Sequence, residues 1–419
     1  MHRGGFITFF IILSGISLLL DWYVFSGLKT LAVGWQQTAR IITFAAYLII
    51  SVGITLLFVL GFGSFTTAKG MTPFHEWMLS LFLTIFVTKL VFILVLSLGD
   101  LSRFVSGIAA NVSKPAGQQT IPYFPSRRKF ISEIAIILAA FPFAGFLYGM
   151  IRGKYDYKVH RETIYFDELP EAFDGFTITQ LSDIHSGSFD NAAAVQRGVD
   201  LAKAQKSDLF VFTGDLVNNA AWEIEPYINT FNQLKAPFGQ FSILGNHDYG
   251  DYVQWDSQAE KDENLQKVKD QHAKLDYKLM LDEHVMLEKG GQKIALIGVQ
   301  NWGRGFIQMG NLDKAIQGVD KDAFKILLSH DPTHWEEKVR NNPNKIHLTL
   351  AGHTHGAQFG VEVAGIRWSP VQYRYVDWAG LAVQNDRYLY VNRGFGFLAF
   401  SGRVGIWPEI TVLTLKRRV

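Results

Sequence analysis

The sequence contains no cysteine. This absence excludes disulfides, thiolate metal sites and cysteine nucleophiles, and it is compatible with either side of a bacterial membrane. Charged residues are also few, at 19%, whereas hydrophobic residues make up 48%. That balance is apolar for a soluble protein. At 419 residues the chain is long enough for one full domain and a second region.

The few charges are unevenly distributed. Residues 1–151 contain ten Lys/Arg and four Asp/Glu, whereas residues 152–419 contain 30 and 34. The C-terminal part is therefore slightly acidic and lacks the basic face typical of nucleic-acid binding, so we expect no nucleic-acid partner. We predict a multi-pass transmembrane region at 1–151, a linker and first strand at 152–172, and a second domain at 173–419.

Four stretches of the N-terminal third are apolar enough to cross a membrane, which takes about 20 helical residues. They occupy residues 6–25, 41–62, 77–98 and 131–151. The alternative, a set of buried core helices, is disfavoured because soluble proteins seldom place four such segments in succession. Lys89 lies in the middle of the third stretch. Pairing inside a helix bundle or snorkelling is favoured there over a functional polar site.

The orientation in the membrane is predicted from the basic residues that flank the four stretches. Seven lie on one side and six on the other, which favours placing residues 152 onward outside the cytoplasm. Residues 126–131, Ser-Arg-Arg-Lys-Phe-Ile, resemble a twin-arginine export signal at an unusual internal position. Alternatively, these basic residues only hold the start of the fourth helix at the cytoplasmic face. Both interpretations predict a multi-pass protein of the bacterial inner membrane with an extracytoplasmic C-terminal domain.

From about residue 160, short β-branched and aromatic runs alternate with polar, helix-compatible stretches, which predicts an α/β domain. Five predicted strands each finish in a Gly or Ser beside Asp, Asn or His. These strand ends lie at 182–185, 214–215, 245–248, 329–330 and 352–356. Because the carboxyl ends of strands form the ligand crevice of α/β sheets, we expect the five ends to converge.

The residue types at these ends suit a metal site. Imidazole and carboxylate groups together bind Zn, Fe or Mn, and an Asn amide oxygen can complete the coordination shell. Each block alone is weak, since an isolated Asp-x-His occurs by chance and a Gly-Asn-His-Asp run is by default a turn. All five blocks in this order, each at a strand end, make coincidence improbable.

Together the blocks resemble the signature of calcineurin-like metallophosphoesterases over roughly residues 173–415. They read Asp183-x-His185, Gly214-Asp215, Gly245-Asn246-His247-Asp248, His330 and Gly352-His353-Thr354-His355. The resemblance implies an α/β fold of four layers, αββα, in which two mixed sheets are flanked by helices.

The later positions are similar to a membrane-linked bacterial branch, which includes twin-arginine-exported phosphoesterases and UDP-2,3-diacylglucosamine pyrophosphohydrolase-like proteins. The positions that carry this similarity are Gln358, Tyr390-Val391-x-x-Gly394-x-Gly396, and Arg403 ahead of Pro408-Glu409-Ile410. Ala357 stands where that branch has a glycine, a change that leaves the metal ligands untouched.

The resemblance implies two divalent ions, Mn, Fe or Zn, and assigns their ligands. Asp183, His185 and His355 would hold one ion; Asn246, His330 and His353 would hold the other; Asp215 would bridge them. Two ions ~3.5–4 Å apart clamp a phosphoryl group and lower the pKa of a shared water, so that hydroxide attacks phosphorus. No candidate protein nucleophile stands out, so no covalent intermediate is expected.

Four further residues receive roles from the resemblance. His247 would face the substrate, where it protonates the leaving group or hydrogen-bonds the phosphoryl oxygens. Asp248 would either orient the His247 ring or cap a turn. Gln358 and Arg403 would contact the substrate, with a structural or surface salt bridge as the alternative for Arg403. Segment 256–278 is predicted to form a solvated helix, with a cap over the pocket as the alternative, and segment 301–305 is hypothesised to form a second rim loop.

The predicted activity is hydrolysis of a phosphodiester, pyrophosphate or phosphomonoester bond in a phosphorylated small molecule, lipid-linked or from the cell envelope. One alternative is the UDP-2,3-diacylglucosamine pyrophosphohydrolase of lipid A synthesis, whose substrate lies on the cytoplasmic side, against the predicted orientation. Another is a non-catalytic metal-binding membrane protein, which is disfavoured because no ligand position is missing. A transporter is disfavoured because four helices show no inverted repeat.

Overall fold

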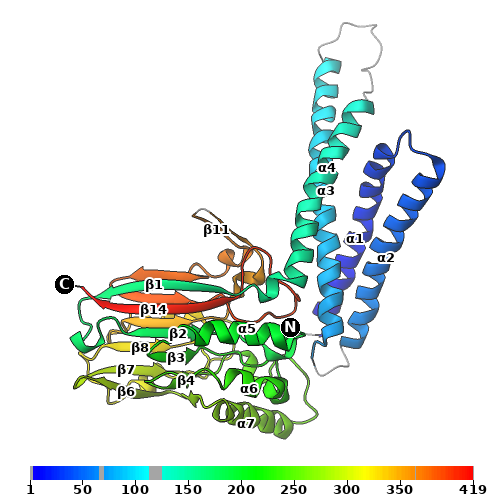
Figure 1. Ribbon diagram of the computed structural model, residues 1–419. Helices are drawn as coiled ribbons and strands as arrows, with labels where there is room; N and C mark the ends of the chain where they lie inside the picture. The colour runs from blue at the N-terminus through cyan, green and yellow to red at the C-terminus, as the bar shows by residue number, and fades with distance from the viewer. Residues whose placement is uncertain (1–2, 66–69, 113–124, 364, 419) are drawn as a thin grey trace. The chain divides into compact units, whose positions relative to one another are not determined.

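The computed structural model describes residues 3–65, 70–112, 125–363 and 365–418 (Figure 1). The chain divides into two compact units, Met1–Tyr148 and Gly149–Val419. Each unit is built around its own apolar core.

The first unit consists of long apolar helices, as the sequence predicts. They are α1 (Arg3–Leu31), α2 (Gln37–Phe65), α3 (Pro73–Val112) and α4 (Pro125–Ile151). All four are long and apolar enough to cross a membrane. Helix α3 is longer than predicted, with 40 residues, because the polar residues after its apolar stretch continue the helix. Pro142 lies inside α4 without ending it.

A buried polar cluster lies between the helices of this unit. Lys89 forms an ion pair with Asp21 at 2.8 Å, and both side chains are almost fully buried. Lys89 also donates to Ser17 Oγ at 3.0 Å, while Tyr47 and Ser51 donate to Asp21. An unpaired charge is costly in an apolar bundle, so these partners explain how Lys89 is tolerated.

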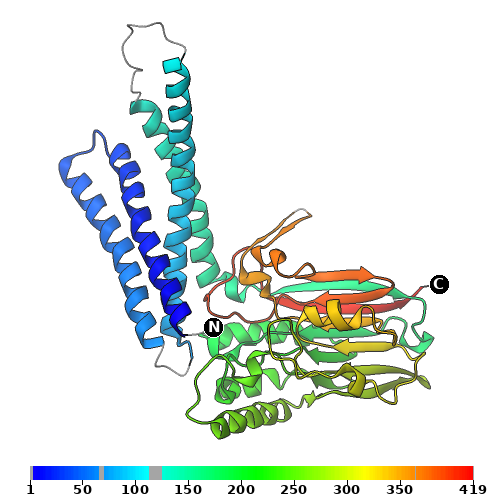
Figure 2. The same cartoon turned by 180° about the vertical axis from the view of Figure 1, so that it is seen from behind.

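The second unit contains two six-stranded sheets (Figure 2). The first has the order β1 (Lys158–Phe166), β14 (Glu409–Arg417), β2 (Thr177–Leu181), β3 (Leu209–Phe212), β4 (Gln240–Ser242), β5 (Lys278–Leu279). The second has the order β12 (Gly380–Gln384), β13 (Arg387–Val391), β9 (Leu348–Ala351), β8 (Lys325–Leu328), β7 (Gln292–Gly298), β6 (Glu283–Lys289). Both sheets mix parallel and antiparallel pairs.

The two sheets pack face to face through one apolar core, to which Ile178 and Val211 contribute from the first sheet and Ile326 and Leu348 from the second. The outer face of the first sheet is covered by helices that include α5 (Ala192–Lys203) and α7 (Gln258–Lys274). The outer face of the second is covered by a cluster around Trp335. This layering confirms the predicted α/β fold of two mixed sheets flanked by helices.

Parallel pairing sets the position of the predicted strand ends. Strands β2, β3 and β4 are parallel neighbours in the first sheet, and β8 and β9 are parallel neighbours in the second. Their carboxyl ends therefore point to the same edge of the two-sheet core. A separate two-stranded sheet, β10 (Val361–Val363) and β11 (Ile366–Trp368), follows β9 in the chain and stands apart from both large sheets (Figure 1).

Candidate metal centre

Main-chain hydrogen bonds join the loops of neighbouring strands. Asp183 N donates to Gly214 O at 2.9 Å, and Gly352 N donates to His330 O at 2.9 Å. His185 N donates to Asp215 O at 3.1 Å. The strand ends therefore converge as expected, and the side chains after them share one small volume.

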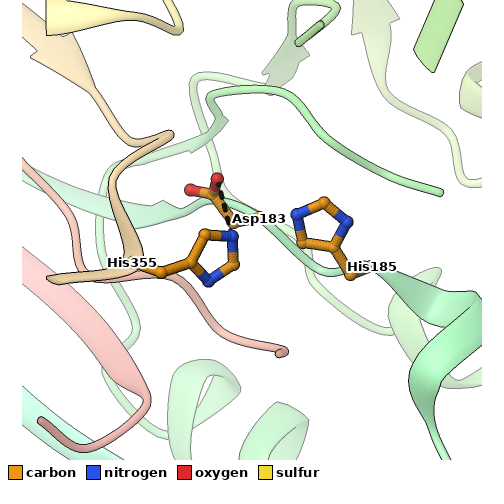
Figure 3. A group of neighbouring side chains, drawn as sticks. All are labelled: Asp183, His185 and His355. Atoms are coloured by element: carbon orange, nitrogen blue, oxygen red, sulfur yellow. Dashed lines mark ion pairs between the residues drawn. The ribbon is translucent and has the colours of Figure 1, made fainter. Parts of the chain in front are cut away.

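One group of side chains comes from the loops after β2 and β9. Asp183, His185 and His355 each place a potential ligand atom within 4.8 Å of the others (Figure 3). His355 Nε2 lies 3.3 Å from Asp183 Oδ1. All three residues are buried, so the group is enclosed by protein.

A second group comes from the loops after β3, β8 and β9. Asp215, His330 and His353 also place ligand atoms within 4.8 Å of one another. Asp215 Oδ2 lies 3.1 Å from His330 Nε2 and 3.5 Å from His185 Nε2. The Asp215 carboxylate therefore stands between the two groups.

Asn246 completes the set of seven residues. Its amide nitrogen donates to the Tyr252 hydroxyl at 2.7 Å, which turns the amide oxygen toward the second group. That oxygen lies 2.8 Å from His353 Nδ1. The structure thus brings together all seven residues that the sequence predicts as ligands.

The donor atoms fit bound cations. Four buried ring nitrogens of these residues make no hydrogen bond of normal geometry: His185 Nδ1, His185 Nε2, His330 Nε2 and His355 Nε2. The three Nε2 atoms lie 3.1–3.5 Å from carboxylate oxygens of Asp183 or Asp215. A buried polar nitrogen without a partner costs about 1–3 kcal/mol. Lone pairs of imidazole and carboxylate directed at a common point are what Zn, Fe or Mn requires, so metal binding would satisfy the unpartnered atoms.

The site also concentrates negative charge. Burial acts to raise the pKa of Asp183 and of Asp215, but the neighbouring imidazoles outweigh it, so both pKa values lie below the ordinary range. Burial opposes protonation of His330, yet the Asp215 carboxylate outweighs it and raises the pKa of His330 to about 10. Bound cations would balance the negative charge of the Asp183 and Asp215 carboxylates in place of the proton on His330.

The backbone at the site is strained. Asp183, His185, Asp215, His353 and His355 all have φ values between 46° and 72°. Left-handed backbone costs a non-glycine residue of order 1–3 kcal/mol and persists where surrounding structure enforces it, often at functional sites. The strain turns each side chain sharply out of its strand and into the shared volume.

Glycines permit the close approach of neighbouring loops. A Cβ on Gly352 would lie 2.0 Å from Ser182 Oγ and 2.3 Å from Asp183 Oδ2. A Cβ on Gly245 would lie 2.2 Å from Asp215 Oδ1. Any side chain at either position would displace a carboxylate of the site.

His247 lies at the edge of the site. Its main-chain N–H donates to Asp215 Oδ1 at 2.8 Å, and its Nδ1 lies 2.8 Å from Asn218 O. Its ring contacts the rings of His185 and Tyr252, with centroids 4.9 Å and 4.3 Å away. Burial lowers the pKa of His247. Because Nδ1 faces a carbonyl, Nε2 is the ring nitrogen left to meet a ligand.

Asp248 caps the loops and does not contact the His247 ring. Its carboxylate accepts hydrogen bonds from the main-chain N–H groups of Gly245, Asp215, Leu216 and Val217, at 2.8–3.3 Å. Burial raises the pKa of Asp248 to about 7, while these donors act in the opposite direction. Of the two roles considered from the sequence, turn capping is the one that matches this geometry.

Gln358 and Arg403, expected to contact the substrate, are committed to the main chain. The Gln358 amide donates to Phe400 O and Gly402 O at 2.7 and 2.9 Å. Arg403 is fully buried and donates to carbonyls that include Gly396 O at 2.6 Å. Its Nη2 also lies 3.2 Å from His355 Nδ1. These contacts hold the loop behind His355.

The sequence did not single out two residues that hold His353 from behind. The Tyr375 hydroxyl lies 2.9 Å from His353 Nε2. Asp331 Oδ2 lies 3.4 Å from the same nitrogen and is buried. Asp331 directly follows His330, which is a signal that could have been noticed. Tyr375 lies beyond the β10–β11 hairpin, where no pattern indicates it.

The two predicted rim segments differ in position. Helix α7, within 256–278, packs on the first sheet through Val268 and His272, so it belongs to the covering layer. Within 301–305, Arg304 pairs with Glu336 and Glu337. The following residue, Phe306, places its ring 4.7 Å from that of His353, which puts this segment beside the site.

Two mixed sheets flanked by helices, with two groups of buried His and Asp where their strands end, define a metallohydrolase-type domain. Residues 176–357 match the family model described as calcineurin-like phosphoesterase. Residues 5–154 match the model described as the transmembrane domain of a probable calcineurin-like phosphoesterase. The chain is therefore a membrane protein that belongs to the calcineurin-like metallophosphoesterases, and the predicted enzyme class is confirmed.

Several curated proteins are similar to this chain. An uncharacterized metallophosphoesterase of Bacillus subtilis is 29% identical over 70% of this chain and 98% of its own length. A phosphodiesterase of Escherichia coli is 25% identical over 69% of this chain and 99% of its own length. A zebrafish transmembrane protein with a metallophosphoesterase domain is 26% identical over 65% of this chain and 60% of its own length.

Proposed function

We propose that this chain is an integral-membrane hydrolase that uses two divalent metal ions to cleave a phosphoric ester or pyrophosphate bond of a lipid-linked or envelope substrate. Asp183, His185 and His355 would hold one ion; Asn246, His330 and His353 the other; Asp215 would contact both. The observation that carries the proposal is the convergence of buried imidazole nitrogens on either side of the Asp215 carboxylate.

When bound, two such ions supply an activated water and neutralise charge on the phosphoryl group. The chain's own residues set up this chemistry. Asp215 separates the two ligand groups and, through its Oδ1, fixes the backbone of His247. The Asp248 carboxylate accepts hydrogen bonds from the main-chain N–H groups of Asp215 and of Gly245, which precedes Asn246. It thereby holds both loops in place. The ligand positions are thereby set before substrate arrives, which limits reorganisation during the reaction.

His247 is the proposed catalytic residue outside the metal ligands. With Nδ1 donating to Asn218 O, Nε2 carries a proton only in the imidazolium form, which the negative charge of a bound phosphoryl group would favour. In that form Nε2 can hydrogen-bond a phosphoryl oxygen or give its proton to the leaving oxygen. The ring is also constrained by contacts with His185 and Tyr252. Removing the ring would therefore slow catalysis without removing a ligand.

The architecture supports the proposal of a membrane substrate. Four apolar helices tether the catalytic unit to a bilayer, which suits a substrate whose apolar part remains in that bilayer while its phosphate reaches the site. The E. coli relative is named a phosphodiesterase, so a phosphodiester is the first bond to test. We place the protein in a bacterial inner membrane with the catalytic unit outside, from the basic residues that flank the helices.

The test is hydrolysis of bis-p-nitrophenyl phosphate by the full-length protein in detergent, stripped of metal and titrated with Mn²⁺, Zn²⁺ or Fe²⁺. We expect metal-dependent turnover, and we expect Asp215→Asn to lose both metal and activity. His247→Ala should keep two bound ions while kcat falls about 10²–10⁴-fold. His160→Ala, a half-buried histidine on β1, serves as the matched control.

The metal content separates the possible failures. A folded protein that binds no metal would contradict the proposed ligand set. A protein that binds two ions but cleaves neither this diester nor lipid-borne phosphodiesters and pyrophosphates would contradict the catalytic role and favour a metal-binding module.

A further inference from the structure

The β10–β11 hairpin has the reverse of the polarity expected on a protein surface. Its pairing places Val361 opposite Trp368 and Val363 opposite Ile366 on one face, and Glu362 opposite Arg367 on the other. An exposed hairpin normally turns its charged side chains to water and its apolar ones to the core. Here the apolar side chains are exposed, with Val363 at 66% and Ile366 at 67%.

The charged side chains of the hairpin contact the domain, although Arg367 itself stays exposed. Glu362 accepts from Arg393 at 2.5 Å, and Arg393 is itself buried against Glu409. Arg367 donates to Ala379 O at 2.6 Å and lies over the Trp378 ring. These contacts fix the orientation of the hairpin, so its apolar face cannot turn inward without breaking the ion pair of Glu362 with Arg393.

The exposed apolar face continues beyond the hairpin. Tyr373 and Val376, in the segment after β11, are 80% and 81% exposed. We define the hairpin patch by its members, Val361, Val363, Ile366, Trp368, Tyr373 and Val376, each classed among the exposed large hydrophobics. Large exposed hydrophobic side chains gathered on one segment of the chain are typical of an interaction surface.

Hydrogen bonds inside the catalytic unit connect the base of the hairpin to the end of α4. The unit includes the last turn of α4, which ends at Ile151. Arg403 N donates to Gly149 O at 3.2 Å, and the next residue, Val404, accepts from Gly360 N at 2.9 Å. The two residues Arg403 and Val404 are therefore hydrogen-bonded both to the end of α4 and to Gly360 at the base of the hairpin.

The same segment connects the patch to the metal centre. Ser369, directly after β11, donates to Gly356 O at 2.7 Å, next to the predicted ligand His355. Tyr375, between patch residues Tyr373 and Val376, bonds His353 Nε2. The segment that carries the patch thus forms part of the wall of the site.

We propose that the hairpin patch inserts into the interfacial layer of the bilayer that holds the transmembrane helices, in the leaflet where α4 ends. Tyr and Trp prefer this layer, and Val and Ile fit its apolar side. Exposed Arg374 lies among them, where its charge would meet lipid phosphates. Docking holds the mouth of the metal centre at the level of the lipid head groups.

The test uses the absence of native cysteine. Ile366→Cys in the full-length protein is labelled with an environment-sensitive fluorophore and reconstituted into phosphatidylcholine–phosphatidylglycerol vesicles. Met286→Cys is the matched control, because Met286 is also an exposed apolar strand residue but lies on β6 at the edge of the second sheet. Quenching is measured with lipids that carry doxyl groups on their acyl chains and with aqueous iodide.

We expect the label at Ile366 to emit at shorter wavelength in vesicles, to be quenched by doxyl lipid and to be protected from iodide. The label at Met286 should behave in the opposite way. Equal iodide quenching at both positions would overturn the proposal. Cross-linking of Ile366→Cys between two protein copies in vesicles, with no doxyl quenching, would overturn it in favour of a dimer contact.

A second measurement separates docking from folding and from catalysis. With the label at Tyr373→Cys, the added pair Val363→Asp and Ile366→Asp should abolish doxyl quenching. Metal content and bis-p-nitrophenyl phosphate hydrolysis in detergent should stay within twofold of the parent, which shows that the fold is kept. Unchanged quenching in this variant would overturn the proposal whatever the enzyme's activity.

Discussion

At the scale of single residues, the imidazoles of the site are held by partners on their outer side. His330 Nδ1 lies 2.7 Å from Thr213 O, His247 Nδ1 lies 2.8 Å from Asn218 O, and His353 Nε2 lies 2.9 Å from the Tyr375 hydroxyl. A fixed partner on one ring nitrogen selects the tautomer and directs the other nitrogen inward. These outer contacts therefore determine the geometry as much as the proposed ligands do.

Tyr375 gives the sharpest prediction at this scale. Tyr375→Phe removes the hydroxyl at His353 Nε2 and keeps the ring, so the His353 ring should be less firmly oriented. We expect the affinity of one of two bound ions to fall about 10–100-fold, measured by competition with a chelator of known affinity. Tyr373→Phe, two residues away and exposed, should leave both affinities unchanged. Equal metal retention in the two variants would refute this role.

The sequence predicts the seven clustered residues because their identity and their place at strand ends carry the information. It does not predict where neighbouring side chains point. Three residues of the same motifs were expected to act with the ligands: Asp248, Gln358 and Arg403. Their polar atoms hydrogen-bond the main chain instead. Side-chain direction at these positions depends on the left-handed turns of the loops, which no local pattern encodes.

At the scale of elements, helix α7 covers the first sheet and buries a neutral histidine. His272 Nδ1 lies 2.9 Å from Ser242 Oγ, and its Nε2 is buried without a partner. Burial lowers the pKa of His272 to about 3. Its contribution to stability is therefore complete above the ordinary pKa of 6.5 and is lost as the pH falls toward 3, since the unfolded chain takes up a proton that the folded chain refuses.

His272→Asn should remove this dependence, because Asn can place a polar atom near the position of Nδ1 and does not titrate. In urea unfolding of the full-length protein in detergent, the wild type should lose up to about 1.4 kcal/mol more per pH unit than the variant below pH 6.5. The two should run parallel above pH 7. Parallel curves throughout would show that His272 does not control acid stability.

The transmembrane helices depend on the ion pair between α1 and α3. Lys89→Met leaves Asp21 buried without its cation, which for buried pairs costs about 3–5 kcal/mol. We expect a lower Tm in detergent, and we expect Lys89→Met with Asp21→Asn to recover most of the loss because no charge is then left unpaired. A double variant no more stable than the single one would contradict this account. The spacing of apolar residues predicts the helices, but the partner of Lys89 emerges only from their packing.

At the scale of the whole molecule, the orientation in the membrane decides which substrates the site can meet. In the first unit, Arg128 of the export-signal-like run lies 3.8 Å from Asp100 and donates to Ser26 at 3.2 Å. These contacts agree with basic residues that anchor the start of α4, the simpler of the two interpretations of that run. Either interpretation keeps the start of α4 inside and the catalytic unit outside.

Two single-cysteine variants in intact cells test this orientation. Glu263→Cys lies on the exposed face of α7 in the catalytic unit. Gln36→Cys lies in the exposed connection between α1 and α2. Because the connection and the catalytic unit are separated by three helices, they must lie on opposite sides if all four helices span. A membrane-impermeant maleimide should label Glu263→Cys and spare Gln36→Cys, which would direct the substrate search to envelope phosphodiesters. The reverse pattern would place the site in the cytoplasm, where a lipid-linked nucleotide sugar becomes the first substrate to test.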